Sequence, residues 1–194
     1  MDLGCGPGLL AARLTAAGFP VLASDPSPAC LAEARRRAPR ARLLRAGWDE
    51  MPLPPGSAAV CAVGEVLNYL PAAGSATRRR AFLERVREAL RPGGVLLLDL
   101  AGPRRAGDGR PRLFTGRDWS LRVASREEGG VLERRIRVEL RSPAGLRIRE
   151  HRHRLALLPP EAFLAELRAA GFACPGPEAS GPAGLWSFVA WAGD

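Results

Sequence analysis

The feature that most constrains the fold is an alternation of short apolar runs and amphipathic segments through residues 1–100. A helical pattern follows the opening glycine-rich turn, and two more cover 26–39 and 78–94. Between these segments, apolar runs predict buried strands at 19–25, 41–47, 58–63 and 95–100. Alternating strands and helices predict an α/β fold, in which a parallel sheet is covered by helices on both faces.

The pattern changes after residue 100. Three segments at 119–126, 131–142 and 145–157 alternate apolar and polar residues, which predicts antiparallel strands with one buried face. A helix at 159–172 and a strand at 185–192 complete the chain. We therefore expect one domain over 1–194, divided into a core at 1–100, an antiparallel β insertion at 113–158, and a terminal helix with strands at 159–194.

The net charge of +9 raises the question of a nucleic-acid partner, because basic surfaces gain affinity by releasing counterions from phosphates. The positive residues are all arginine, with no lysine, and they are dispersed without the interleaved aromatics that stack on bases. A solvated cationic surface is therefore preferred to nucleic-acid binding. No apolar run is long enough to span a membrane and no signal peptide is visible, so a cytoplasmic protein without a membrane partner is expected.

The cysteines show no metal-binding pattern. They lack CxxC or Cys/His spacing, and most lie within or beside apolar runs, which favours reduced, buried side chains over disulfides or zinc ligands. No metal site is predicted. The four are Cys5, Cys30, Cys61 and Cys174.

The opening stretch MDLGCGPG predicts a ligand-binding turn between a strand and a helix. Its glycines allow a ligand to approach the backbone closely, and Asp25 ends the next strand, where a carboxylate can accept hydrogen bonds from ribose hydroxyls. The turn lacks GxGxxG spacing and contains no basic residue, which favours a nucleoside cofactor without phosphate. Asp25 also has a structural alternative, as a cap for the helix that follows.

Together, DLGCGPG, the acid at 25, LRPGG before a strand, and LRAAGF before a terminal hairpin closely resemble the class I S-adenosylmethionine-dependent methyltransferases. GEVLNYLP and the late EHRHRL resemble small-molecule enzymes of the type 11/25 group. This resemblance implies a Rossmann-like, three-layer α/β/α fold with a mostly parallel sheet and a C-terminal antiparallel hairpin. It implies S-adenosyl-L-methionine as cofactor and a small-molecule acceptor, without identifying the acceptor.

Carried over by position, the resemblance implies two groups of site residues. The residues expected to bind the cofactor are Asp2, Gly4, Cys5, Gly6, Asp25, Pro26, Trp48, Asp49, Glu65 and Asn68. The residues expected at the methyl-transfer centre are Glu65, Tyr69 and His153. Gly47 stands where the family usually has an acid for the adenine amine, so Asp49 would replace that acid and Trp48 would stack on adenine.

Structural alternatives remain for several of these residues. Glu65 and Asn68 are equally well explained as caps of the turn after the strand at 58–63. Trp48 has the alternative of covering the core, and His153 that of a solvated strand residue. Two other functions also stay open. One is a non-catalytic binding module on the same fold, and the other is an RNA methyltransferase.

The first strand has only three residues before Gly4, fewer than the five or six usual for a strand. We expect it to form a stub at the centre of the sheet, and we interpret Met1 as standing where an internal residue of a longer protein belongs. The antiparallel insertion has two expected roles. It would form a wall of the acceptor pocket or pair two protomers of a homodimer.

Overall fold

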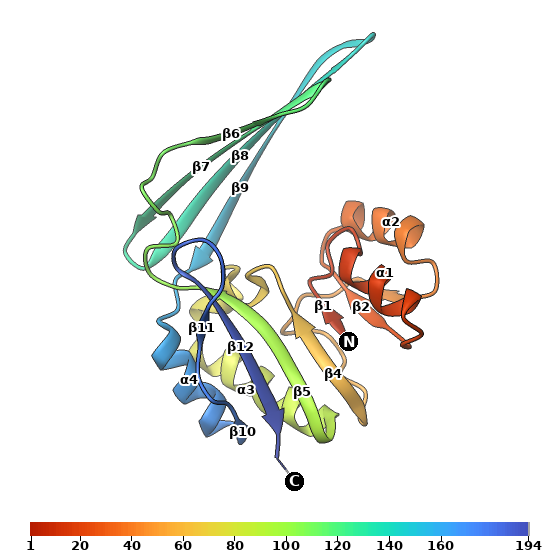
Figure 1. Ribbon diagram of the computed structural model, residues 1–194, viewed down its shortest axis with the longest axis vertical. Coiled ribbons are helices and arrows are strands. Elements are labelled where there is room, and N and C mark those ends of the chain that lie inside the picture. Colours follow the sequence, from red (N-terminus) through yellow and green to blue (C-terminus); the bar gives the residue numbers. More distant parts are fainter. Residues whose placement is uncertain (194) are drawn as a thin grey trace.

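A computed structural model describes residues 1–193, which form two separate β-sheets (Figure 1). The main sheet has eight strands in the order β10-β12-β5-β4-β1-β2-β3, with β11 paired to β12. Strands β1 to β5 are parallel to one another, and β12 runs antiparallel to β5. The bounds are β1 Asp2–Leu3, β2 Leu22–Ser24, β3 Arg42–Leu44, β4 Ser57–Ala62, β5 Leu90–Ala101, β10 Phe172–Ala173, β11 Glu178–Ala179 and β12 Leu185–Ala192.

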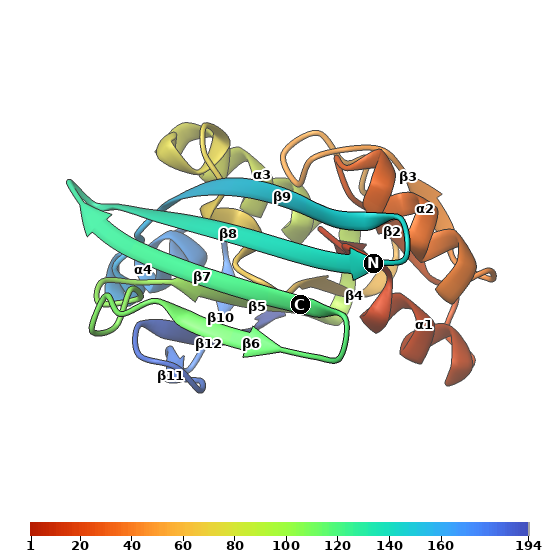
Figure 2. The ribbon, with the colours of Figure 1, turned by 90° about the horizontal axis from the view of Figure 1, so that it is seen from above.

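Four helices cover the two faces of this sheet in the described part of the chain (Figure 2). They are α1 Leu9–Ala16, α2 Pro28–Arg37, α3 Ala76–Ala89 and α4 Pro160–Ala169. Helices α1 and α2 pack small residues, among them Ala11 and Ala34, against Ala23 of β2. On the other face, α3 and α4 bury Phe82 and Phe163 in a larger apolar core. The predicted three-layer α/β/α arrangement is therefore confirmed.

Local sequence signals explain where two helices begin. The Ser27 hydroxyl accepts the Cys30 N–H at 3.3 Å, and Pro28 occupies the first turn of α2. The Ser75 hydroxyl accepts the Arg78 N–H at 3.2 Å in the same way at the start of α3. These caps fix the angle at which each helix leaves the carboxyl edge of the sheet.

Strand β1 is the expected stub at the centre of the sheet. Its two residues pair with β2 through Asp2 and Ala23, and with β4 through Asp2 and Cys61. The Met1 carbonyl also accepts the Cys61 N–H at 2.9 Å. The strand places the glycine turn directly at the carboxyl edge of its two neighbours, which is where parallel sheets bind ligands.

The second sheet has the order β6-β7-β8-β9 and is antiparallel throughout. Its strands are β6 Arg112–Thr115, β7 Trp119–Glu128, β8 Val131–Ser142 and β9 Gly145–Ala156. On β8, Arg134, Ile136 and Val138 share one side with their β9 partners His153, His151 and Arg149. We call this side the inner face, because Arg134 reaches back to the main sheet.

Two differences from the sequence prediction affect strands. Strand β6 was not among the three predicted strands of the insertion at 113–158, and its four residues pair with β7. Strand β5 begins at Leu90 rather than Val95, because Leu90 already pairs with Ser57. Opposite Pro92, Gly93 and Gly94, which would favour a turn, the pairing of β4 with β5 has a register irregularity between Ser57 and Ala59. In residues 1–193, no helix is long and apolar enough to cross a membrane.

Candidate functional site

The glycine turn after β1 adopts a conformation that only glycine tolerates well. Gly4, Gly6 and Gly8 all have positive φ values, at 62°, 51° and 79°. A Cβ at Gly4 would lie 2.6 Å from a methyl group of Val66, so close packing also requires glycine there. A Cβ at Gly6 would meet nothing within 4 Å, which leaves the space beside its backbone open.

Asp25 connects the end of β2 to this turn. Its Oδ2 accepts the Gly6 N–H at 2.9 Å, and its Oδ1 accepts the Ser27 N–H at 2.8 Å. The carboxylate therefore lies at the glycine turn, where a ligand contact is expected, and it also holds the backbone that leads into α2. Pro26 follows it at the surface, and its carbonyl accepts Arg45 Nε at 3.4 Å.

Asp2 has a buried polar atom that the protein leaves without a partner. The residue is 3% exposed, and its Oδ2 accepts no hydrogen bond from any described residue. Burial raises the pKa of this carboxyl to about 6. A buried, unpaired carboxylate oxygen is costly, and a ligand that donates a hydrogen bond there would remove the cost. The neighbouring Cys5 is buried too, and burial raises the pKa of its thiol to about 12.

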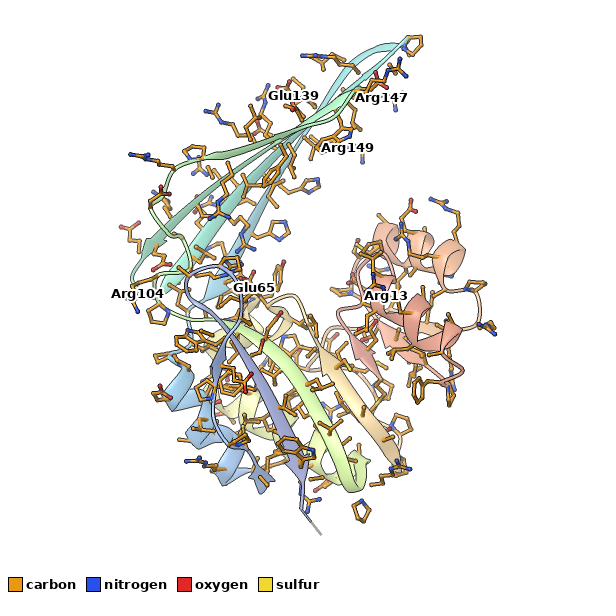
Figure 3. All side chains as sticks on the ribbon, viewed as in Figure 1. Arg13, Glu65, Arg104, Glu139, Arg147 and Arg149 are labelled. Atoms are coloured by element: carbon orange, nitrogen blue, oxygen red, sulfur yellow. The ribbon has the colours of Figure 1, made fainter. Side chains whose placement is uncertain are left out.

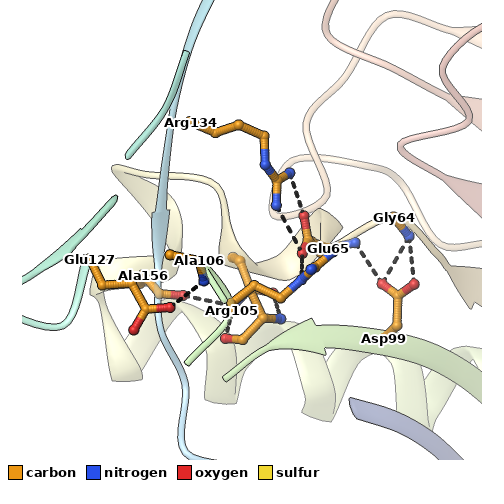
Figure 4. Close-up of polar contacts among 10 residues, drawn as sticks. Gly64, Glu65, Asp99, Arg105, Ala106, Glu127, Arg134 and Ala156 are labelled. Atoms are coloured by element: carbon orange, nitrogen blue, oxygen red, sulfur yellow. Dashed lines mark hydrogen bonds and ion pairs between the residues drawn. The ribbon is translucent and has the colours of Figure 1, made fainter. Parts of the chain in front are cut away.

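The turn after β4 contains a second group of polar residues, centred on Glu65 (Figure 4). The Glu65 side chain is 6% exposed and is paired with two arginines. Arg105 Nε lies 2.5 Å from its Oε1, and Arg134 Nη1 lies 2.7 Å from its Oε2. Burial opposes ionisation, but hydrogen bonds and charge from these arginines outweigh it, so the pKa of Glu65 is lowered.

This ion-pair cluster makes Glu65 a poor proton acceptor. Its carboxylate is ionised, and both oxygens already accept guanidinium hydrogen bonds. Arg105 comes from the connection between β5 and β6, whereas Arg134 comes from β8. Glu65 therefore ties the second sheet to the main one. Its side chain makes no cap hydrogen bond in the turn, so this structural role differs from the turn cap that the sequence left as an alternative.

Asp99 holds the backbone of the same turn. Its Oδ1 accepts the N–H groups of Gly64 at 2.8 Å and Glu65 at 2.5 Å. Both residues have positive φ values, 104° for Gly64 and 60° for Glu65, and the latter is an uncommon conformation for a non-glycine residue. Two charge-assisted hydrogen bonds thus stabilise a strained turn at the carboxyl edge of β4.

Tyr69 and His153 lie together beside this turn. Their rings form an edge-to-face pair with centroids 5.6 Å apart, and Tyr69 also bridges to Leu155 of β9. Burial, with the positive charge of Arg134, lowers the pKa of His153. Burial raises the pKa of Tyr69. At neutral pH the imidazole is therefore uncharged and can accept a proton, while the phenol keeps its own.

The glycine turn after β1 and the turn after β4 adjoin each other. Val66, which follows Glu65, packs against Gly4 so closely that no side chain fits at that glycine. The site thus joins Asp2, Gly6 and Asp25 at β1 and β2 to Tyr69 and His153 beyond β4. In the described part of the chain, no group of three or more His, Cys, Asp or Glu side chains could hold a metal ion.

Three of the residues predicted to contact the cofactor are held by other protein residues. Trp48 is 5% exposed and packs edge-to-face against Phe82 at 5.1 Å, because its indole fills the core under α3. The Asp49 carboxylate pairs with Arg78 of α3 at 3.1 Å. The Trp48 ring is therefore part of the core, whereas Asp49 keeps one oxygen without a hydrogen bond and its contact with adenine stays a prediction.

Asn68 is the third. Its amide nitrogen donates to the carbonyls of Ala101 and Ala156, at 2.9 and 2.7 Å, and its Oδ1 accepts the Ala101 N–H at 2.9 Å. These bonds commit the buried side chain to joining β5 and β9. Asn68 therefore has a structural role, but it links two strands and does not cap the turn after β4.

Three site residues escaped the sequence analysis, namely Asp99, Arg105 and Arg134. Asp99 is the one acid in the apolar run at 95–100, and an acid in a buried strand was a signal sufficient to find it. Arg105 and Arg134 lie 40 and 69 residues from Glu65 along the chain. Nothing local distinguishes them from the many other arginines of this sequence.

Residues 1–98 match a family model described as a methyltransferase domain. The chain belongs to this family, the class I S-adenosylmethionine-dependent methyltransferases. Among curated proteins, the trans-aconitate 2-methyltransferase of Methylobacterium nodulans is 38% identical over 105 residues. That alignment covers 52% of this chain and 37% of the relative's length.

Solved structures of methyltransferases share the fold over nearly the whole chain. An amino pentose methyltransferase from Micromonospora echinaspora, involved in calicheamicin biosynthesis and solved with S-adenosylmethionine bound, is 27% identical with a TM-score of 0.79. The comparison covers 98% of this methyltransferase and 81% of that chain. An S-adenosylmethionine-dependent methyltransferase from Clostridium acetobutylicum has a TM-score of 0.85 at 14% identity, covering 100% and 83%.

Proposed function

We propose that this methyltransferase transfers a methyl group from S-adenosyl-L-methionine to a small-molecule acceptor, with the cofactor held by the glycine turn and Asp25. The observation that carries the proposal is the open backbone at Gly6, whose N–H is fixed by Asp25 beside the unpartnered oxygen of Asp2. A close approach to backbone, an acid at the end of β2 and an unsatisfied acceptor together fit a nucleoside with an amino-acid tail.

When bound, the cofactor supplies an activated methyl group on a sulfonium. The protein residues then need to hold the acceptor in line and exclude water, and orientation of this kind accounts for a large part of many rate enhancements. Tyr69 and His153 lie beyond β4, where the acceptor would lie. The uncharged His153 imidazole would take the proton that the acceptor loses, and the Tyr69 hydroxyl would orient the acceptor.

The proposal is tested by incubating the protein with S-adenosylmethionine and a panel of small molecules, and measuring S-adenosylhomocysteine and methylated products by mass spectrometry. The panel includes trans-aconitate and an amino sugar, since these are the acceptors named for relatives. We expect acceptor-dependent turnover that falls at least about tenfold in His153→Gln and is retained in His151→Gln. Cofactor binding without turnover on any acceptor would favour the non-catalytic module instead.

A further inference from the structure

Arg105 carries hydrogen-bond donors that the protein does not use. Its Nε donates to Glu65, and its two terminal nitrogens make no hydrogen bond within residues 1–193. The Arg105 side chain is only 16% exposed, and that of Arg134 is 18% exposed. A guanidinium presents its donors in a fixed fork that matches a carboxylate or a phosphate.

Protein donors already engage the carboxylates beside these arginines. Both oxygens of Glu65 accept guanidinium hydrogen bonds, and both oxygens of Asp99 accept the N–H of Gly64. A cationic acceptor would have to share these oxygens with the donors that hold them. An acceptor that brings lone pairs and negative charge would find unused donors instead.

The inner face of the second sheet, which extends away from the core, is also positively charged. Arg147 and Arg149 of β9 lie on the same side as Arg134, and Figure 3 shows Arg149 and Glu139 on opposite sides of the sheet. The carboxylate on the inner side at the base of β7, Glu127, is taken by the N–H groups at residues 104 and 106. The face above the site is thus basic.

From this arrangement we propose that the acceptor carries a carboxylate or phosphate group, and that the terminal nitrogens of Arg105 bind it. Arg134, whose terminal nitrogens both bind Glu65, adds positive charge beside that group. The inference rests on the proposed function, because it names the chemical class of the acceptor at the same site. Arg105 acts as a specificity-determining residue, since it contacts the acceptor away from the atom that receives the methyl group.

The test is calorimetric titration of two probes, trans-aconitate and inorganic pyrophosphate, into protein saturated with S-adenosylhomocysteine at constant ionic strength. We expect at least one probe to bind saturably, and to bind about tenfold more weakly to Arg105→Gln. Arg105→Lys keeps the charge but loses the fork, so it should also weaken binding. Arg110→Gln is the matched control, because Arg110 lies in the same connection with an 88% exposed side chain.

Preference for trans-aconitate would identify a carboxylate acceptor, and preference for pyrophosphate a phosphate-bearing one. The proposal is overturned if neither probe binds the wild-type protein, or if Arg105→Gln binds both as well as Arg110→Gln does. The same titrations without S-adenosylhomocysteine test the arginines independently. Failure of cofactor binding, with anion binding retained, would therefore count against the proposed function and not against this site.

Discussion

The carboxylate of Asp99 accepts the backbone N–H of Glu65 at 2.5 Å, and so fixes the one strained, non-glycine residue at the carboxyl edge of β4. The side chain of Glu65 in turn holds the arginine from β8. A chain of hydrogen bonds therefore runs from the main sheet through the turn to the second sheet. It adds to the links that Asn68 and Tyr69 make with β9.

Replacing Asp99 with Asn should loosen that turn. The amide keeps one acceptor oxygen, but its NH₂ group would face the Gly64 N–H that Oδ2 accepts, so we expect the free energy of unfolding to fall by about 1–2 kcal/mol. Chemical denaturation measures this loss. Asp108→Asn is the control, because Asp108 lies in an exposed loop with only Arg110 as its ionic partner. An equal, negligible effect of both substitutions would contradict the positioning role of Asp99.

The buried carboxyl of Asp2 predicts an unusual dependence of stability on pH. Its folded pKa of about 6 lies above the ordinary value near 4, so between these values the folded chain binds more protons than the unfolded chain. This group therefore makes the protein less stable as pH rises through the window from about 4 to 6. The expected loss from this one group is about 2 kcal/mol.

Comparison of the wild type with Asp2→Asn isolates this effect, because other titrating groups contribute to both proteins. Urea denaturation at several pH values should show the wild type losing stability, relative to the variant, as pH rises from 4 to 6. A constant difference between the two proteins across this window would show that Asp2 titrates normally.

The pKa of His153 should respond to Arg134. Burial lowers this pKa first, and the arginine charge lowers it further. We expect NMR titration to place it below the ordinary value near 6.5, and Arg134→Gln to raise it. The chain has two histidines, so His151→Gln assigns the signals. Arg122→Gln, on the opposite side of the second sheet, should leave the pKa unchanged.

Much of the fold could be predicted because its signals are local. Strand β8 at Val131–Ser142 was predicted with both boundaries, since Leu132, Ile136, Val138 and Leu140 recur on one side between two turn signals. Strand β6 was missed because four residues after a Gly/Pro-rich stretch are too few to show a period of their own. Its existence depends on pairing with β7, a tertiary effect.

The site residues also divide into those with a local sequence signal and those without one. Asp25 and the glycine turn were found because an acid at a strand end and glycines at a tight turn are each recognisable locally. Trp48 was misplaced because a tryptophan after a strand is equally compatible with a ligand platform and with a core residue, and only packing against Phe82 decides. The arginine partners of Glu65 come from distant elements, so only the folded chain brings them together.

The central claim is that a ligand approaches the backbone at Gly6, and calorimetric titration of S-adenosylhomocysteine into three proteins tests it most directly. Gly6→Ala and Gly18→Ala are matched, because both glycines have positive φ and neither new Cβ would meet a protein atom within 4 Å. We predict that the wild type and Gly18→Ala bind alike, and that Gly6→Ala binds at least about tenfold more weakly. No binding by the wild type, or equal binding by the two variants, would contradict the account.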